Sequence, residues 1–222
     1  MKRGSEPALP TCVLCRAVGA TRTFAVTDRT FYRCDRCAIV FVEPAQRLSA
    51  LDESQRYHQH HNDASDDGYV RFLHRLADPL IVAVPQGAVG IDYGCGPAPV
   101  LSAILSATGR PTVAYDPLFF PDTQLLDASF DFVTCSEVVE HAHDPLALFT
   151  RVGAMTREDG TIAVMTSFYD SPAAFEEWWY QRDRTHVSFY NEETMRWIAR
   201  HFGWAVSFPV ANVALFVIKA SV

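Results

Sequence analysis

The chain has 222 residues, of which 49% are hydrophobic and 20% are charged, so it can bury a sizeable core and is not a disordered chain. Its formal net charge of −7 disfavours a nucleic-acid partner, because an acidic chain repels phosphate backbones unless a basic patch intervenes. No stretch approaches the roughly 20 apolar residues of a membrane helix, and residues 1–10 have no apolar signal core. The composition therefore predicts a cytoplasmic protein without a membrane partner.

Two Cys-x-x-Cys pairs come first along the chain. Cys12 and Cys15 are followed, after 18 intervening residues, by Cys34 and Cys37. Each pair presents two thiolates to one tetrahedral ion, and two pairs complete the coordination shell, which predicts a structural zinc site. A segment this short cannot build a stable core without the metal. We expect residues 1–44 to form a small zinc-ribbon-like appendage; the alternative is four unrelated buried cysteines.

A polar linker and a leading helix are expected over residues 45–84. Residues 45–68 are rich in Gln, His, Asp and Ser, which is typical of a solvated connection. From Tyr69 to about Val84, apolar residues recur on one helical stripe. We expect three solvated histidines in the linker: His58, His60 and His61.

Strands and helices alternate over residues 85–222, which predicts a parallel sheet covered on both faces. The expected strands are Ala88–Tyr93, Thr112–Tyr115, Phe130–Cys135, Thr161–Thr166, Val206–Phe208 and Val213–Lys219. The expected helices run over 99–107, from Pro145 to about Met155 behind the cap Asp144, and through Phe202 behind the cap Asn191.

The first of these strands ends in a glycine loop. Gly94 and Gly96 let the chain turn sharply and let a ligand touch the backbone, and the following helix N-terminus favours a carboxylate or phosphate. Asp116 follows Asp92 by 24 residues, at the end of the next strand, where an acid can accept both ribose hydroxyls. The fingerprint of a dinucleotide-binding loop would need Gly or Ala at position 99. This chain has Pro99 there, so the loop does not match that fingerprint. A bare glycine turn is the alternative.

The loop resembles motif I of class I S-adenosylmethionine-dependent methyltransferases, with Ala98 in place of the last glycine. Further blocks resemble this superfamily in the same order: Phe130–His141, Gly160–Val164, Arg184–Tyr190 and Asn212–Phe216. The resemblance covers about residues 85–220. It implies a Rossmann-like α/β fold: a mostly parallel sheet with helices on both faces and an antiparallel last strand. It also implies S-adenosylmethionine as cofactor, bound by Asp92, Gly94, Cys95, Gly96, Asp116, Cys135 and Ser136.

Two regions add to this resemblance or depart from it. Phe31–Phe41 resembles the cysteine knuckle found ahead of some bacterial small-molecule methyltransferases. Only 13 residues separate Asp116 from Phe130, where the family usually has a helix and a strand ending in an acid that contacts adenine. Pro117 and Pro121 disfavour that helix, so the adenine contact is not carried over.

An acid–histidine run follows the third strand. Glu137, Glu140 and His141 lean to one side if the chain turns helically there. The run resembles the metal site of small-RNA 2′-O-methyltransferases, where a further histidine comes from the block that here contains His186, and a similar run occurs in ubiquinone-pathway O-methyltransferases. The resemblance predicts a second site, for Mn²⁺, Fe²⁺ or Zn²⁺, that lowers the pKa of an acceptor hydroxyl. The alternatives are a metal-free general base at His141 or His186, or no catalytic role.

Together these features predict an S-adenosylmethionine-dependent methyltransferase that acts on a small molecule at oxygen or carbon. The aromatic residues between 168 and 180 either cover the acceptor as a lid or pack in the core. Two other functions stay open. One is an RNA-modifying methyltransferase, because some ribosomal-RNA guanine methyltransferases join a cysteine knuckle to this fold; the other is a non-enzymatic cofactor-binding protein.

Overall fold

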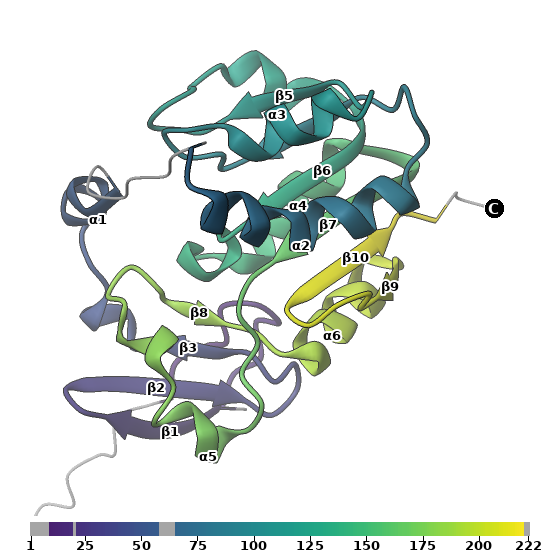
Figure 1. Cartoon of the computed structure of the whole chain (residues 1–222). Coiled ribbons are helices and arrows are strands. Elements are labelled where there is room, and N and C mark those ends of the chain that lie inside the picture. The colour runs from purple at the N-terminus through teal and green to yellow at the C-terminus, as the bar shows by residue number, and fades with distance from the viewer. Residues whose placement is uncertain (1–8, 20, 58–64, 220–222) are drawn as a thin grey trace, which may run out of the picture.

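The computed structural model describes residues 9–19, 21–57 and 65–219, and it contains two β-sheets (Figure 1). In this view the larger sheet and its helices occupy the upper part, and the smaller sheet lies below them. Among the described residues, none of the helices has the length and apolar run that a membrane crossing requires. The three histidines predicted to be solvated, His58, His60 and His61, lie outside the described residues.

The larger sheet has six strands. They are β4 (Gly90–Tyr93), β5 (Thr112–Tyr115), β6 (Phe130–Ser136), β7 (Thr156–Met165), β9 (Ala205–Ser207) and β10 (Val213–Val217). Their order is β5-β4-β6-β7-β10-β9. The β4–β5, β4–β6 and β6–β7 pairs are parallel, whereas β10 is antiparallel to both β7 and β9. The predicted mostly parallel sheet with an antiparallel last strand is confirmed.

Helices cover both faces of this sheet, as predicted. The longer helices are α2 (Asp67–Ala83), α3 (Val100–Ala107), α4 (Pro145–Ala154) and α6 (Glu192–Phe202). Alternate residues of β6 serve the two faces: Phe132 packs with α2 and α3, and Val133 packs with α4 and α6. The side chains of Asp144 and Asn191 accept hydrogen bonds from the first turns of α4 and α6, so both predicted caps are observed.

The smaller sheet has four strands: β1 (Thr21–Val26), β2 (Arg29–Cys34), β3 (Val40–Val42) and β8 (Ser188–Phe189). The first three form an antiparallel ribbon around the cysteine pairs, a zinc-ribbon-like arrangement. The fourth comes from the distant segment before α6 and pairs with β3. The division at residues 44 and 84 stays a prediction, and the β3–β8 pairing joins the two parts that it separates.

A third core lies between the smaller sheet and the chain that follows β7. Phe31 and Phe189 from the sheet contact Phe175, with ring centroids 5.1 Å apart in each case. Tyr169 and Tyr180 are also buried there. Tyr169, Phe175 and Tyr180 therefore pack in a core, which is one of the two alternatives that the sequence left open.

Two regions differ most from the predictions, whereas the segment between β5 and β6 agrees with the departure from the family pattern described above. The strand expected from Thr161 begins at Thr156. The expected polar linker contains η1 (Pro44–Gln46) and α1 (Ala50–Tyr57). Between β5 and β6 the short helix η2 (Thr123–Asp127) takes the place where the family usually has a helix and a strand. Two further short helices, α5 (Pro172–Phe175) and η4 (Trp179–Arg182), lie between β7 and β8.

Candidate active site

A cavity of about 440 Å³ opens at the carboxyl ends of β4, β5 and β6. The chain leaves β4 toward β5 on one side and continues to β6 on the other, so this is the point where the strand order reverses. Ligands bind at such a crevice in open α/β sheets, because the loops there diverge and leave the strand ends uncovered. The cavity is the natural place to test the predicted site residues.

The glycine loop forms the floor of the cavity next to β4. Gly94 and Gly96 have φ angles of 77° and 67°, which side chains rarely adopt. A Cβ on Gly94 would lie 2.7 Å from the side chain of Val138. The backbone N–H of Gly96 donates to Oδ2 of Asp116 at 3.1 Å, so that carboxylate lies against the loop.

Two carboxylates of the predicted cofactor site differ in their surroundings. Asp92 is 3% exposed and accepts hydrogen bonds from the hydroxyls of Thr134 and Ser102 at 2.8 and 3.3 Å. Burial raises the pKa of Asp92 to about 6. Asp116 accepts from the backbone N–H groups at 118 and 119 and from the glycine loop. Both carboxylates line the cavity.

The structure brings six of the seven predicted cofactor residues to this one cavity. They are Asp92, Gly94, Cys95, Gly96, Asp116 and Ser136. Cys135 is not among the residues that line it. The Cys135 side chain is buried in the core on the α4 and α6 face, because it alternates with its neighbour Ser136 along β6.

The acid–histidine residues lie on the adjoining wall. Glu137 has a φ of 53°, and the chain then enters the short helix η3 (Val139–His141), which supplies the predicted helical turn. One ligand atom from each of Glu140, His141 and His186 lies within 4.8 Å of the others. Glu137 stands outside this trio, and its carboxylate is joined to that of Glu140 through the hydroxyl of Tyr180.

Glu140 is fully buried, and its two oxygens have different environments. Oε1 accepts from the hydroxyl of Tyr180 at 2.6 Å. Oε2 has no hydrogen-bond partner within the described part of the chain. A buried carboxylate oxygen without a donor is costly, so this arrangement favours a cation or donor ligand at the cavity wall. Burial and then the neighbouring Glu140 raise the pKa of Glu137 to about 8, which places a proton on this pair at neutral pH.

Both histidines are held by backbone carbonyls. Nδ1 of His141 lies 3.1 Å from the carbonyl oxygen of Thr185, and Nδ1 of His186 lies 2.8 Å from that of Tyr180. A carbonyl oxygen can only accept, so Nδ1 carries the hydrogen in each ring and Nε2 is the basic nitrogen. Burial lowers the pKa of His186, which keeps that ring neutral and able to accept a proton or bind a metal.

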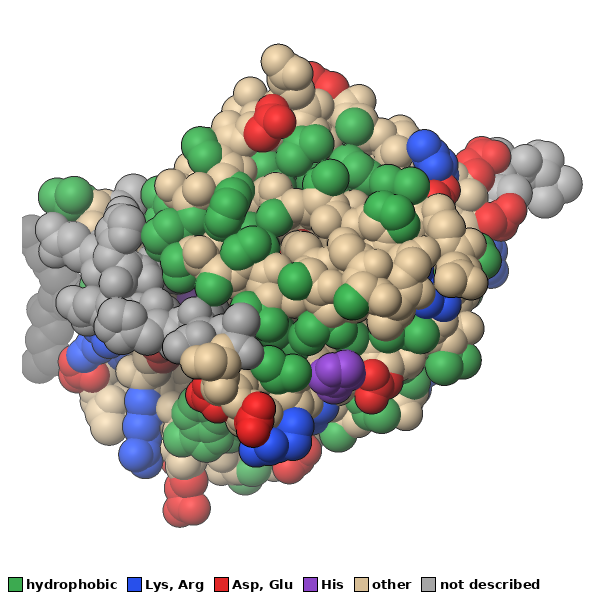
Figure 2. All heavy atoms as spheres, turned by 45° about the horizontal axis from the view of Figure 1, so that its top comes forward, with side chains coloured by type: hydrophobic (Ala, Val, Ile, Leu, Met, Phe, Trp, Pro, Cys, Tyr) green, Lys and Arg blue, Asp and Glu red, His purple; other side chains and the backbone are tan. Residues whose placement is uncertain are grey.

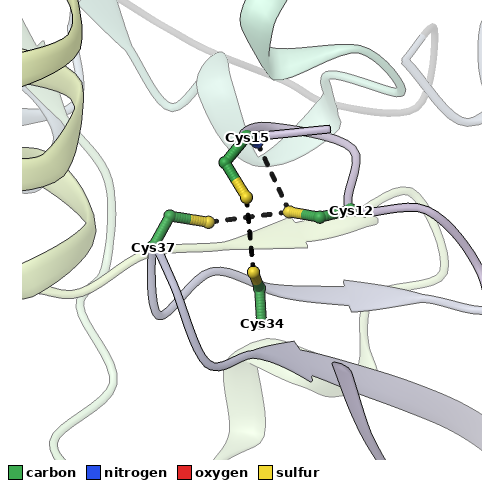
Figure 3. Close-up of side chains that lie close together, drawn as sticks. All are labelled: Cys12, Cys15, Cys34 and Cys37. Carbon is green, nitrogen blue, oxygen red and sulfur yellow. Dashed lines mark hydrogen bonds between the residues drawn. The ribbon is translucent and has the colours of Figure 1, made fainter. Parts of the chain in front are cut away.

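The four N-terminal cysteines form a separate cluster (Figure 3). Figure 3 shows the side chains of Cys12, Cys15, Cys34 and Cys37 converging from two turns on a common centre. The Sγ atoms of Cys12 and Cys37 are 3.6 Å apart, and those of Cys15 and Cys34 are 3.4 Å apart. Sulfurs bound to one tetrahedral zinc ion at about 2.3 Å lie about 3.8 Å from one another. The cluster therefore fits the predicted zinc site.

Sequence reasoning missed two residues of the candidate site. Tyr180 was grouped only with the aromatic cluster, yet its hydroxyl contacts Glu137, Glu140 and Thr166. Arg29 is buried and donates to backbone carbonyls of the segment that carries His186. Neither residue stands in a motif, so no spacing signal marks them.

The sheet order, the antiparallel last strands and the glycine loop define a class I S-adenosylmethionine-dependent methyltransferase. Residues 58–207, more than half of the chain, match the model of a methyltransferase domain family. The chain belongs to this methyltransferase domain family, and the predicted superfamily is confirmed. A search of curated proteins found no significant match.

Three solved structures illustrate the shared fold. The 1,6-didemethyltoxoflavin-N1-methyltransferase of Burkholderia thailandensis, solved with 1,6-didemethyltoxoflavin and S-adenosylhomocysteine, is 16% identical with a TM-score of 0.55, over 90% of this chain and 100% of that one. A second structure is a chain of the complex between the Haloferax volcanii Trm112 methyltransferase activator and a methyltransferase. It is 15% identical with a TM-score of 0.53, over 71% of this chain and 95% of that one. The third is the magnesium protoporphyrin IX methyltransferase of Synechocystis PCC 6803, with bound S-adenosylhomocysteine. It is 13% identical with a TM-score of 0.50, over 76% of this chain and 94% of that one. At these identities the similarity establishes the fold.

Proposed function

We propose that the protein transfers the methyl group of S-adenosylmethionine to a small-molecule acceptor, at oxygen or carbon. The observation that carries this proposal is the trio of Glu140, His141 and His186 on the cavity wall that adjoins the glycine loop. The loop and the trio share one cavity, so a bound methyl donor would face groups able to activate a nucleophile.

The cofactor half of the cavity supports this placement. In our proposal the backbone of Gly94 and Gly96 receives the methionine end of the cofactor, and the negative charge of Asp92 attracts its positive charge. Asp116 holds the ribose hydroxyls. Its Oδ2, which accepts from the N–H of Gly96 in this structure, accepts instead from a ribose hydroxyl when the cofactor binds. Cys95 and Ser136 complete the wall between these contacts.

The acceptor half favours a small neutral or cationic molecule. Among the described residues that line the cavity there is no lysine or arginine, and the acids on the acceptor side are Glu137 and Glu140. Apolar side chains of Tyr69, Phe72 and Leu148 add a surface for a ring or hydrocarbon. On the face shown in Figure 2, the Lys and Arg side chains are scattered and form no continuous basic patch. These features disfavour a nucleic-acid backbone.

Two metal sites belong to the proposal. One is a structural zinc ion on the four cysteines. The other is a divalent cation held by Glu140, His141 and His186, with Glu137 beside it, whose mixed oxygen and nitrogen donors suit Mn²⁺, Fe²⁺ or Zn²⁺. Such an ion lowers the pKa of an acceptor hydroxyl, which would make the reaction an O-methylation. Without it, Nε2 of His186 is the group placed to take the acceptor proton.

The test is S-adenosylhomocysteine release with a panel of hydroxylated aromatic and heteroaromatic compounds, enolisable dicarbonyl compounds, and folded RNA over a series of salt concentrations. We expect turnover with a member of the first two groups. Turnover confined to RNA would replace the proposal with RNA modification, and cofactor binding without any turnover would favour a binding protein.

The catalytic trio is then tested on the acceptor so identified. Glu140→Gln and His186→Asn should lower kcat at least tenfold, whereas the matched control Glu192→Gln, an exposed acid of α6, should not. Loss of activity on chelation and its return with Mn²⁺ would support the metal, provided that zinc content stays constant. Full activity in both variants would remove the trio from the mechanism.

A further inference from the structure

One buried, charged side chain of the smaller sheet contacts the segment that carries His186. Arg29 of β2 is 3% exposed. Its Nη1 donates to the carbonyl oxygens of Gln181 and Asp183 at 2.6 and 3.0 Å, and its Nη2 donates to that of His186 at 2.8 Å. Although burial lowers the pKa of Arg29 to about 10, the guanidinium remains charged at neutral pH.

These carbonyls belong to a segment with little regular structure. Residues 180–187 run from within the short helix η4 to the residue before β8. Buried carbonyls need donors, and the planar fork of one guanidinium supplies several at once. The same segment is tied at its end, because Val42 of β3 donates to the carbonyl of Val187, and Val187 donates to that of Glu140.

The segment in turn orients both imidazoles. Its first carbonyl, that of Tyr180, accepts from His186, and that of Thr185 accepts from His141. The carbonyls that Arg29 holds lie between and beside these two. A shift of the segment would change the direction of both rings, whose centroids are 4.8 Å apart, relative to the buried carboxylate of Glu140.

We propose that Arg29 is a positioning residue of the active site, which fixes segment 180–187 through three backbone carbonyls and thereby sets the tautomer and direction of His186. The zinc-ribbon-like sheet is then the outer support of the acceptor wall. The catalytic consequence rests on the proposed function, but the effect on the histidine does not.

The test uses the full chain with ¹⁵N-labelled histidine. In the wild type, the ring nitrogens of His186 should report a single tautomer with hydrogen on Nδ1. Arg29→Met removes the charge and the donors, and we expect a mixture of tautomers or exchange broadening for His186. Arg29→Lys keeps the charge without the fork and should restore the signal in part. The matched control is Arg184→Met: Arg184 also bridges these two parts of the chain, but through an exposed pair with Asp28, and its loss should leave His186 unchanged.

A role in global stability alone would lower the melting temperature without changing the tautomer of the folded population. Binding of S-adenosylhomocysteine, measured by calorimetry, should stay within about twofold of the wild type in Arg29→Met. A folded Arg29→Met protein with an unchanged His186 spectrum would overturn the proposal. If neither variant folds, the proposal is tested on the wild type. The Nη–H signals of Arg29 should then be resolved and slow to exchange with solvent. A freely rotating guanidinium with fast-exchanging hydrogens would contradict the proposal.

With an acceptor in hand, Arg29→Met should lower kcat at least tenfold and leave the KM for S-adenosylmethionine unchanged. An unchanged kcat beside a changed tautomer would leave the positioning of His186 intact and instead contradict the catalytic role assigned to that histidine. The two proposals therefore fail in different ways.

Discussion

Replacement of Asp92 by asparagine should make the folded protein more stable at neutral pH and weaken its hold on the cofactor. Burial raises the pKa of Asp92 from 3.8 to about 6. Between these two values the unfolded chain has released its proton while the folded chain retains it, so the free energy of unfolding falls as pH rises and then levels above pH 6. At about 1.36 kcal/mol for each pH unit, the loss amounts to about 3 kcal/mol.

Asparagine removes this loss and keeps the shape of the side chain. Thr134 can still donate to the amide oxygen, and the hydroxyl of Ser102 can accept from the amide nitrogen. Urea unfolding from pH 4 to pH 8 should give curves that meet near pH 4 and separate toward neutral pH, with Asp92→Asn the more stable. Calorimetry at pH 7.5 should show weaker binding of S-adenosylmethionine, since the neutral amide no longer attracts the positive cofactor.

A control of opposite sign is available at Asp131. The backbone N–H of Val89 and then Arg157 lower the pKa of Asp131, so its carboxylate stabilises the folded state above the unfolded pKa and loses that effect as pH falls. Asp131→Asn should therefore be less stable than the wild type at neutral pH. Parallel curves for wild type and Asp92→Asn would refute the assignment of a buried, costly carboxylate at position 92.

Three further predictions concern single sites. Elemental analysis should find about one zinc per chain in the wild type, and Cys34→Ser should lose it together with part of the thermal stability; retention of full zinc would exclude this ligand set. Asp116→Ala should weaken S-adenosylhomocysteine binding by about 1.5–3 kcal/mol, since it removes charge-assisted hydrogen bonds, and calorimetry showing no change would exclude the ribose contact. Gly90→Ala should destabilise the fold by about 1–3 kcal/mol in urea unfolding, because its Cβ would lie 2.0 Å from the ring of Phe132; the relaxed ring would have to move into a packed core.

Much of the larger sheet could be predicted because its signals are local. The residues of β5 matched the expected strand, and the caps Asp144 and Asn191 were readable from their side chains and the following residues. The glycine loop was recognisable because Gly94 and Gly96 stand at a fixed spacing after a strand, and glycine adopts their positive φ angles without steric cost. These features depend on neighbours within a few residues, which is the range over which a sequence pattern acts.

The rest depends on contacts between distant residues. A two-residue strand such as β8 has no periodicity, and its partner β3 lies in another part of the chain. Cys135 was assigned to the cofactor from its motif, but the alternation of β6 turns its side chain into the core. Tyr180 and Arg29 act on groups that no spacing links to them, so their contacts with Glu140 and His186 emerge only in three dimensions.

The pairing of β3 with β8 also affects when the smaller sheet can be completed during synthesis. The cysteine ribbon leaves the ribosome well before β8, because Arg29 and its acceptor at Gln181 are 152 residues apart. Until β8 is synthesised, β3 is an edge strand with open hydrogen-bonding groups, which is the kind of edge that recruits other chains. The nascent chain must keep that edge unpaired while residues 43–187 are made, so fragments that end before residue 188 should be the most prone to aggregate.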